Sequence, residues 1–120
     1  MDRTVLLIAA LAGFVAVALG AFGAHGLRGR LSPEVLTAFE TGVRYQMYHA
    51  LALFATALLM TRLSGRLIQA AAWLFMTGIV LFSGSLYTLA LTGSSVFGAI
   101  TPIGGLAFLA GWACLAIAVL

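Results

Sequence analysis

Charge is scarce in this sequence. Charged residues make up only 8% of the 120 residues, lysine is absent, and the positive charge comes from six arginines. This excludes the dense basic surface that binds nucleic acid, so we expect no nucleic-acid partner. Hydrophobic residues, by contrast, make up 63% of the chain. A soluble domain of this size cannot bury so much apolar surface, and we therefore expect an integral membrane protein whose solvent is the lipid bilayer.

Cysteine and catalytic motifs are also lacking. Cys114 is the single cysteine, so no disulfide can form within the chain. The sequence contains no serine in a nucleophile-elbow context, no phosphate-binding glycine loop, no metalloprotease helix and no paired carboxylates. Its two histidines have no nearby cysteine or second carboxylate to complete a metal site. We predict a protein that is not an enzyme and holds no metal.

Long uncharged stretches dominate what is present. A helix rises 1.5 Å per residue, so about 20 apolar residues cross the hydrocarbon core of a bilayer. No charged residue follows Arg66, and that apolar remainder is divided by a polar break at Thr92–Ser95 and by a helix-start signal, Thr101-Pro102. We predict an all-α membrane bundle forming one domain over residues 1–120, with four transmembrane helices at 4–25, 45–61, 67–91 and 102–120.

The N-terminal stretch resembles a secretory signal, because Arg3 precedes an apolar run. The uncharged run from Thr4 to Leu27 is 24 residues long, which exceeds the roughly 7 to 15 residues of a signal core. We therefore expect a retained first helix.

The segment before the second span has a different pattern. Ser32-Pro33 is a helix-start signal, because the serine oxygen can cap free amides and proline suits the first helical position. Apolar residues then fall on one stripe and polar residues on the other. The sequence predicts an amphipathic interfacial helix at 33–44 that leads into the second span, with a bend at Gly42.

Arginine positions leave the orientation open. In a four-span protein the N-terminus and the second loop carry Arg3, Arg62 and Arg66, against Arg28, Arg30 and Arg44 on the other side. The positive-inside rule therefore does not choose a side.

Small residues recur at helical spacing. The first span has them at every fourth position, and the last span repeats the spacing at Ala107 and Gly111. Such residues let helix backbones approach closely in lipid. We expect the first-span series to pack within the bundle rather than to form the seam of a homo-oligomer, and Ser83-Gly84-Ser85 to mark another close crossing; the series comprises Ala12, Ala16, Gly20 and Ala24.

One group of polar residues stands out near the first loop. Because His25 ends the first span and His49 begins the second, we predict that their imidazoles lie at the same membrane face and can meet. Glu40 and Arg44 are four residues apart and can form an ion pair. The candidate cluster comprises His25, Glu40, Arg44, Tyr45, Gln46, Tyr48 and His49.

This cluster has two interpretations. It can hold a small molecule such as haem, a quinone or a lipid headgroup, or relay protons. It can equally be structural, with interfacial tyrosines as anchors, Arg44 against lipid phosphate and histidines bonded to backbone carbonyls. The structural interpretation is the simpler one, and no cofactor is assigned.

Four segments form a familiar ordered series: GAFGAHGL at 20–27, ETGVRYQMYH at 40–49, LFSGSLY at 81–87 and ITPIGG at 100–105. Over almost its whole length the chain resembles the YgdD/YwdK-type family, the bacterial domain of unknown function 423, which is related to the eukaryotic transmembrane protein 256. The resemblance implies a small protein of the plasma (bacterial inner) membrane with three or four helices, and it implies no activity.

Three functions remain. The first is an accessory or assembly subunit of a larger membrane complex, because tight helix seams and few polar groups suit contact with partners. The second is a small-molecule site at His25 and His49. The third is a transporter formed by oligomers, although no continuous polar stripe runs through any span.

Overall fold

The computed structural model describes residues 2–120, which fold into a bundle of long helices. Helix α1 (Asp2–Phe22) continues through a π-helical segment, η1 (Gly23–Leu27), to the first loop. Together α1 and η1 form the first rod of the bundle. Helix α2 (Pro33–Leu59) returns antiparallel to α1. The next rod consists of α3 (Arg66–Gly78), the π-helical segment η2 (Ile79–Ser83) and α4 (Gly84–Thr92), and α5 (Val96–Ala118) completes the bundle.

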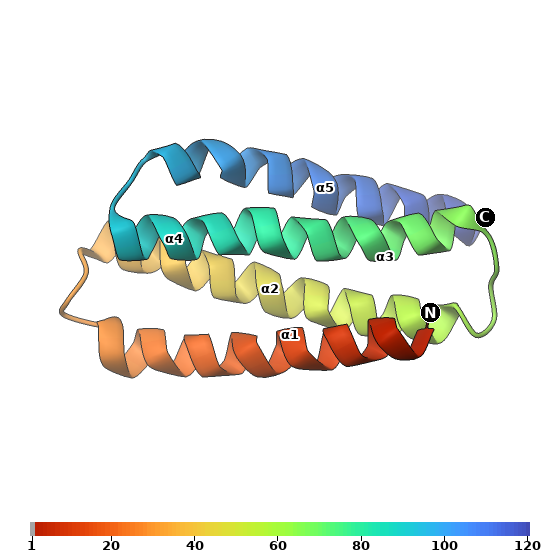
Figure 1. The fold of residues 1–120 in the computed structure, drawn as a ribbon, viewed down its shortest axis with the longest axis horizontal. Coiled ribbons are helices and arrows are strands. Elements are labelled where there is room, and N and C mark those ends of the chain that lie inside the picture. Colours follow the sequence, from red (N-terminus) through yellow and green to blue (C-terminus); the bar gives the residue numbers. More distant parts are fainter. Residues whose placement is uncertain (1) are drawn as a thin grey trace.

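The helices run up and down, and both chain ends lie at the same end of the bundle (Figure 1). The longest dimension is 47 Å, close to the roughly 40–45 Å of a bilayer with its headgroups. Within residues 2–120, three rods are long and apolar enough to cross a membrane, namely 2–27, 66–92 and 96–118. An all-helical membrane bundle is therefore confirmed.

The second helix is continuous. We expected an interfacial helix at 33–44 that leads into the span at 45–61 with a bend at Gly42, and residues 33–59 form one α-helix. Its N-terminal part lies along the first rod: a Cβ on Gly23 would meet the Phe39 ring at 3.0 Å, and one on Gly20 would meet Val43 at 3.3 Å. Close packing on α1 thus aligns the amphipathic segment with the bundle.

The two helix-start signals have different outcomes. Ser32 caps α2, because its Oγ accepts a hydrogen bond from the Val35 amide at 3.3 Å, and Pro33 follows directly. The signal at Thr101-Pro102 was wrong, since α5 already begins at Val96 and contains Pro102 in its second turn. Proline removes one amide donor there, which a helix tolerates when tertiary contacts hold it, and the Thr101 hydroxyl is 2.6 Å from Ser85 Oγ on α4.

Close crossings hold the rods together. Gly42 of α2 lies against Tyr87, Gly111 of α5 against Phe75, and Gly104 of α5 against the backbone of Leu81 and Phe82. In the first-span series Ala16 is buried and Gly20 packs on α2, as expected, whereas Ala24 is exposed. Small residues therefore set most of the interhelical distances, as is typical of membrane helices.

Candidate functional site

The interior polar side chains form hydrogen bonds between helices. The Gln46 amide nitrogen donates to the carbonyl oxygen of Ala12 on α1 at 2.8 Å, and its amide oxygen accepts from the Tyr87 hydroxyl on α4 at 2.6 Å. Ser83 donates to the carbonyl oxygen of Gly42 at 2.6 Å. Gln46 thus links three rods from the middle of α2.

His49 is buried between α2, α3 and α5. Its ring is stacked on Phe108, with centroids 3.5 Å apart and planes 8° from parallel. The Trp112 indole N–H lies 3.1 Å from Nε2, and Nδ1 lies 2.8 Å from the carbonyl oxygen of Tyr45. Because an indole N–H only donates and a carbonyl only accepts, His49 is the neutral tautomer that carries its proton on Nδ1. Both ring nitrogens are therefore occupied within the fold.

The predicted meeting of the two histidines is wrong. His25 is exposed in η1 at the end of the bundle, whereas His49 lies ten residues beyond Phe39, the residue that packs on Gly23. Ten residues of α-helix span about 15 Å. The first loop does bring the end of the first rod close to the start of α2. The side chain of His49, however, lies further along α2, inside the bundle, and faces α5.

The remaining aromatic members of the cluster lie near the surface. Tyr45 and Tyr48 are 39% and 53% exposed and form an edge-to-face pair with ring centroids 5.5 Å apart. The Tyr45 ring also lies 4.8 Å from Phe82. The predicted cluster therefore divides into an interior group, Gln46 and His49, and a peripheral group on the outside of α2.

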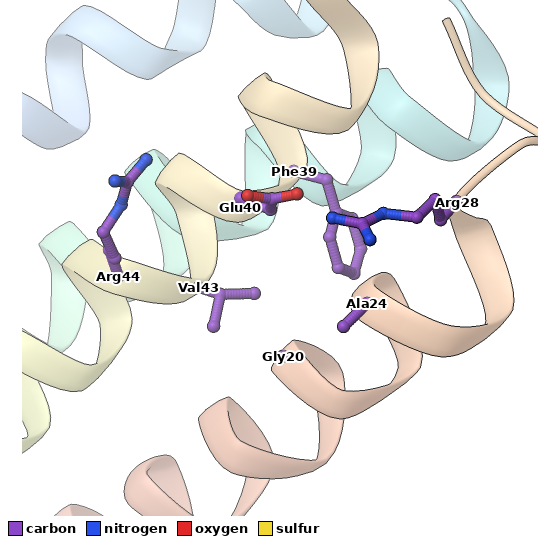
Figure 2. Close-up of a pocket in the computed structure, with 7 residues that line it drawn as sticks. All are labelled: Gly20, Ala24, Arg28, Phe39, Glu40, Val43 and Arg44. Carbon is purple, nitrogen blue, oxygen red and sulfur yellow. The ribbon is translucent and has the colours of Figure 1, made fainter. Parts of the chain in front are cut away.

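A cavity of about 290 Å³ lies between α1 and α2 near the first loop. Figure 2 shows Arg28 reaching toward the Glu40 carboxylate from the end of the first rod, while Arg44 extends from α2 on the other side of Glu40. Among the described residues, no salt bridge within 4.0 Å joins Glu40 to Arg44 or to Arg28. The expected Glu40–Arg44 ion pair is thus not formed, and both groups line an open cavity instead.

Comparison with known proteins places the chain. The family model described as "Protein of unknown function (DUF423)" matches residues 19–105. The chain belongs to this DUF423 family. It is 49% identical to the UPF0382 membrane protein YwdK of Bacillus subtilis, over 97% of this chain and 95% of that protein. It is 43% identical to the UPF0382 inner membrane protein YgdD of Escherichia coli, over 93% of this chain and 86% of that protein. No solved structure matches.

Membership agrees with the architecture. The chain is a multi-pass membrane protein of the bacterial inner membrane, with the apolar rods and helical fold that such a protein requires. Within this DUF423 chain, segment 20–27 of the first rod lies against segment 40–49 of α2. Segment 81–87 packs against segment 100–105 of α5.

Sequence reasoning missed several residues that this DUF423 fold uses. Tyr87 and Ser83 stand in one of the familiar segments, but nothing in their spacing identified Gln46 and Gly42 as their partners. Trp112 and Phe108 were not among the candidate residues, yet they enclose His49. Arg28 was recognised as a loop charge, and its place in the cavity with Glu40 depends on the packing of α1 on α2.

Proposed function

We propose that this protein is a four-span accessory or assembly subunit of a larger membrane complex. The proposal has two parts: that α2 crosses the membrane with the other rods, and that the bundle acts through its outer surface by contacting another membrane helix.

Chain connectivity supports a membrane-crossing α2. The first rod and the α3–α4 rod run in the same direction (Figure 1), and both are apolar enough to cross. A chain that crosses once through α1 must return to the starting side before it can cross again in the same direction. Helix α2, with 27 residues, is the only segment between them and is long enough to do so.

Topology labelling tests this part. In a variant whose Cys114 is replaced by serine, we expect an impermeant maleimide to modify only one of the single cysteines at Arg30 and Ser64 in intact cells, and the other only after the membrane is permeabilised. A cysteine at Ser95 should share the side of Arg30. If α2 did not cross, the cysteines at Arg30 and Ser64 would instead label from the same side.

The hydrogen bonding of the buried polar side chains supports a role at the outer surface. Among the described residues, no buried side-chain nitrogen or oxygen lacks a hydrogen-bond partner. Gln46 and His49, the two polar residues deepest in the candidate cluster, are both engaged by other helices. The polar groups that proton relay or ligand binding inside the bundle would require are already used to hold the helices together.

Gly84 is the observation that carries the partner proposal. We expected Ser83-Gly84-Ser85 to be one close crossing, and the two serines do bond to other helices. A Cβ on Gly84, however, would meet no atom within 4 Å. This glycine instead lines an open groove of about 310 Å³ between α4 and α5. With Thr88 one turn after it, Gly84 presents the small-residue spacing by which membrane helices approach closely.

Co-purification of matched variants tests the partner. From native-level expression and mild detergent, we expect the protein to elute with another membrane protein at fixed stoichiometry. Gly84→Leu should abolish that association, because the side chain occupies the groove, while its Cβ meets no atom of the fold within 4 Å. Gly98→Leu is the control, since a Cβ on Gly98 also meets nothing within 4 Å and Gly98 does not line the groove. Elution of the protein alone, elution only with further copies of itself, or a partner indifferent to Gly84→Leu would each contradict the proposal.

A further inference from the structure

The cavity between α1 and α2 has an unusual position relative to the apolar part of the chain. Glu40 and Arg44 border it from α2, and their neighbours Phe39 and Val43 pack on Gly23 and Gly20. Those glycines belong to a run without charge from Thr4 to Leu27. Four to seven residues of helix separate them from Leu27, or about 6 to 10 Å. The carboxylate and the guanidinium therefore lie below the level of the first loop.

Charges at this depth need a partner, because lipid solvates them poorly. The fold itself does not supply one: within the described residues, Glu40 forms no salt bridge within 4.0 Å with either arginine. Figure 2 shows the carboxylate between Arg28, at the end of the first rod, and Arg44, one turn further along α2. Two arginines beside one carboxylate suit a ligand that carries both signs of charge, because the guanidinium groups bind its anionic part and the carboxylate its cationic part.

The rest of the cavity is small and apolar. Gly20 and Ala24 form its wall on the first rod, and Phe39 and Val43 contribute the apolar part of the wall on α2. These apolar walls can therefore hold the hydrocarbon part of a ligand that lies next to its polar headgroup.

A second groove follows the contact between α1 and α2 from this cavity toward the middle of the membrane. It has a volume of about 610 Å³ and an almost wholly apolar lining. On α2 it is bordered by Met47, one turn beyond Val43, and on α1 by residues that precede Gly20 in the chain, among them Gly13 and Val17. A polar cavity at the surface that leads into an apolar groove along the helices has the shape of a phospholipid.

We propose that the cavity and the apolar groove between α1 and α2 together bind one phospholipid with an amine-bearing headgroup, a phosphatidylethanolamine. Arg28 and Arg44 donate hydrogen bonds to the phosphate, and Glu40 accepts hydrogen bonds from the ammonium group. One acyl chain lies in the apolar groove beside Gly13, Val17 and Met47. The site is independent of the partner groove at Gly84, which lies on α4.

Native mass spectrometry of the purified full-length protein tests the site. The probes are phosphatidylethanolamine, phosphatidylcholine and phosphatidylglycerol with identical acyl chains, each added at the same concentration. We expect the native protein to retain the ethanolamine lipid in preference to the other two. Arg28→Gln and Arg44→Gln should each weaken its retention about tenfold, the usual effect of losing one hydrogen bond to a charged group.

Glu40→Gln tests recognition of the lipid amine separately from recognition of its phosphate. Without the carboxylate, the preference for ethanolamine over choline should disappear and retention of the glycerol lipid should rise. Arg30→Gln is the matched control, because Arg30 lies in the same loop as Arg28 and does not line the cavity. Equal retention of all three lipids by the native protein, or equal losses in Arg30→Gln and Arg28→Gln, would overturn the proposal.

Two uncharged variants distinguish a lipid from a soluble phosphate compound and guard against misfolding. Ala24→Leu fills the headgroup cavity and Gly13→Leu fills the apolar groove, and neither residue is buried in the fold. Both should lower lipid retention. Soluble phosphoethanolamine should compete weakly with the lipid. If it displaced the lipid fully at equal concentration, or if Gly13→Leu bound as the native protein does, the acyl groove would be refuted.

Discussion

Replacement of Gly104 by alanine is expected to be the most damaging single-methyl change in the bundle. A Cβ at this position would overlap the backbone nitrogen of Phe82 and lie 2.7 Å from the carbonyl carbon of Leu81. Both neighbours are backbone atoms of η2, so no side-chain rotation relieves the overlap. Overpacking of this kind costs typically 1–3 kcal/mol, and we expect about 3 kcal/mol here. The midpoint of denaturant unfolding in detergent, followed by tryptophan fluorescence, measures the loss.

The neighbouring glycine supplies the control. A Cβ on Gly105 would lie 3.8 Å from the Phe82 ring, an ordinary contact distance. Gly105→Ala should therefore leave the unfolding free energy within about 0.5 kcal/mol, or raise it slightly, because alanine favours helix over glycine. Equal effects of the two substitutions would show that α5 does not cross η2 at Gly104.

Replacement of His49 by alanine is expected to destabilise the bundle by about 2–3 kcal/mol, in the lower part of the range for truncating a packed side chain. The variant loses the ring stacked on Phe108 and the bonds to Trp112 and to the Tyr45 carbonyl. His25→Ala should have almost no effect, because His25 is exposed. The same unfolding measurement compares the two variants directly.

Trp112→Phe isolates the hydrogen bond from the packing around His49. It keeps a ring at the crossing and removes the indole N–H, so we expect a loss of about 0.6 kcal/mol, the average for an interhelical hydrogen bond in a membrane. If His49 were a ligand for haem instead, the purified protein would absorb in the Soret region and both histidine variants would lose that absorbance. Such a result would refute the structural role of His49.

The composition and charge spacing predicted the membrane class and the approximate rods well. The stretches 4–25 and 67–91 correspond to helices that end at Leu27 and Thr92, because lipid allows a chain to cross only where its backbone is fully bonded and its side chains are apolar. Helix ends were less predictable. The Ser-Pro and Thr-Pro signals look alike in sequence, yet Ser32 caps α2 and Thr101 lies inside α5, bonded to Ser85.

The positions of the candidate residues in the fold were only partly predictable. The sequence grouped Gln46 and His49 with other polar residues near the first loop, and in the structure both are buried and hydrogen-bonded. Their partners Tyr87 and Trp112 are 41 and 63 residues away in the chain, and no local pattern encodes such pairings. The predicted contact between His25 and His49 failed because shared proximity to one loop says nothing about depth along the helix axis.

The sequence by itself determined that this chain is a helical membrane protein, because hydrophobicity and the scarcity of charge act residue by residue. It also placed the unusual polar residues on particular helices. Only the tertiary structure decided what those residues do: it enclosed His49 with Phe108 and Trp112, left Gly84 open to the outside, and set Glu40 between two arginines above an apolar groove. These outcomes depend on the register and rotation of each helix against its neighbours, which are fixed by interdigitation of small and large side chains across the crossings.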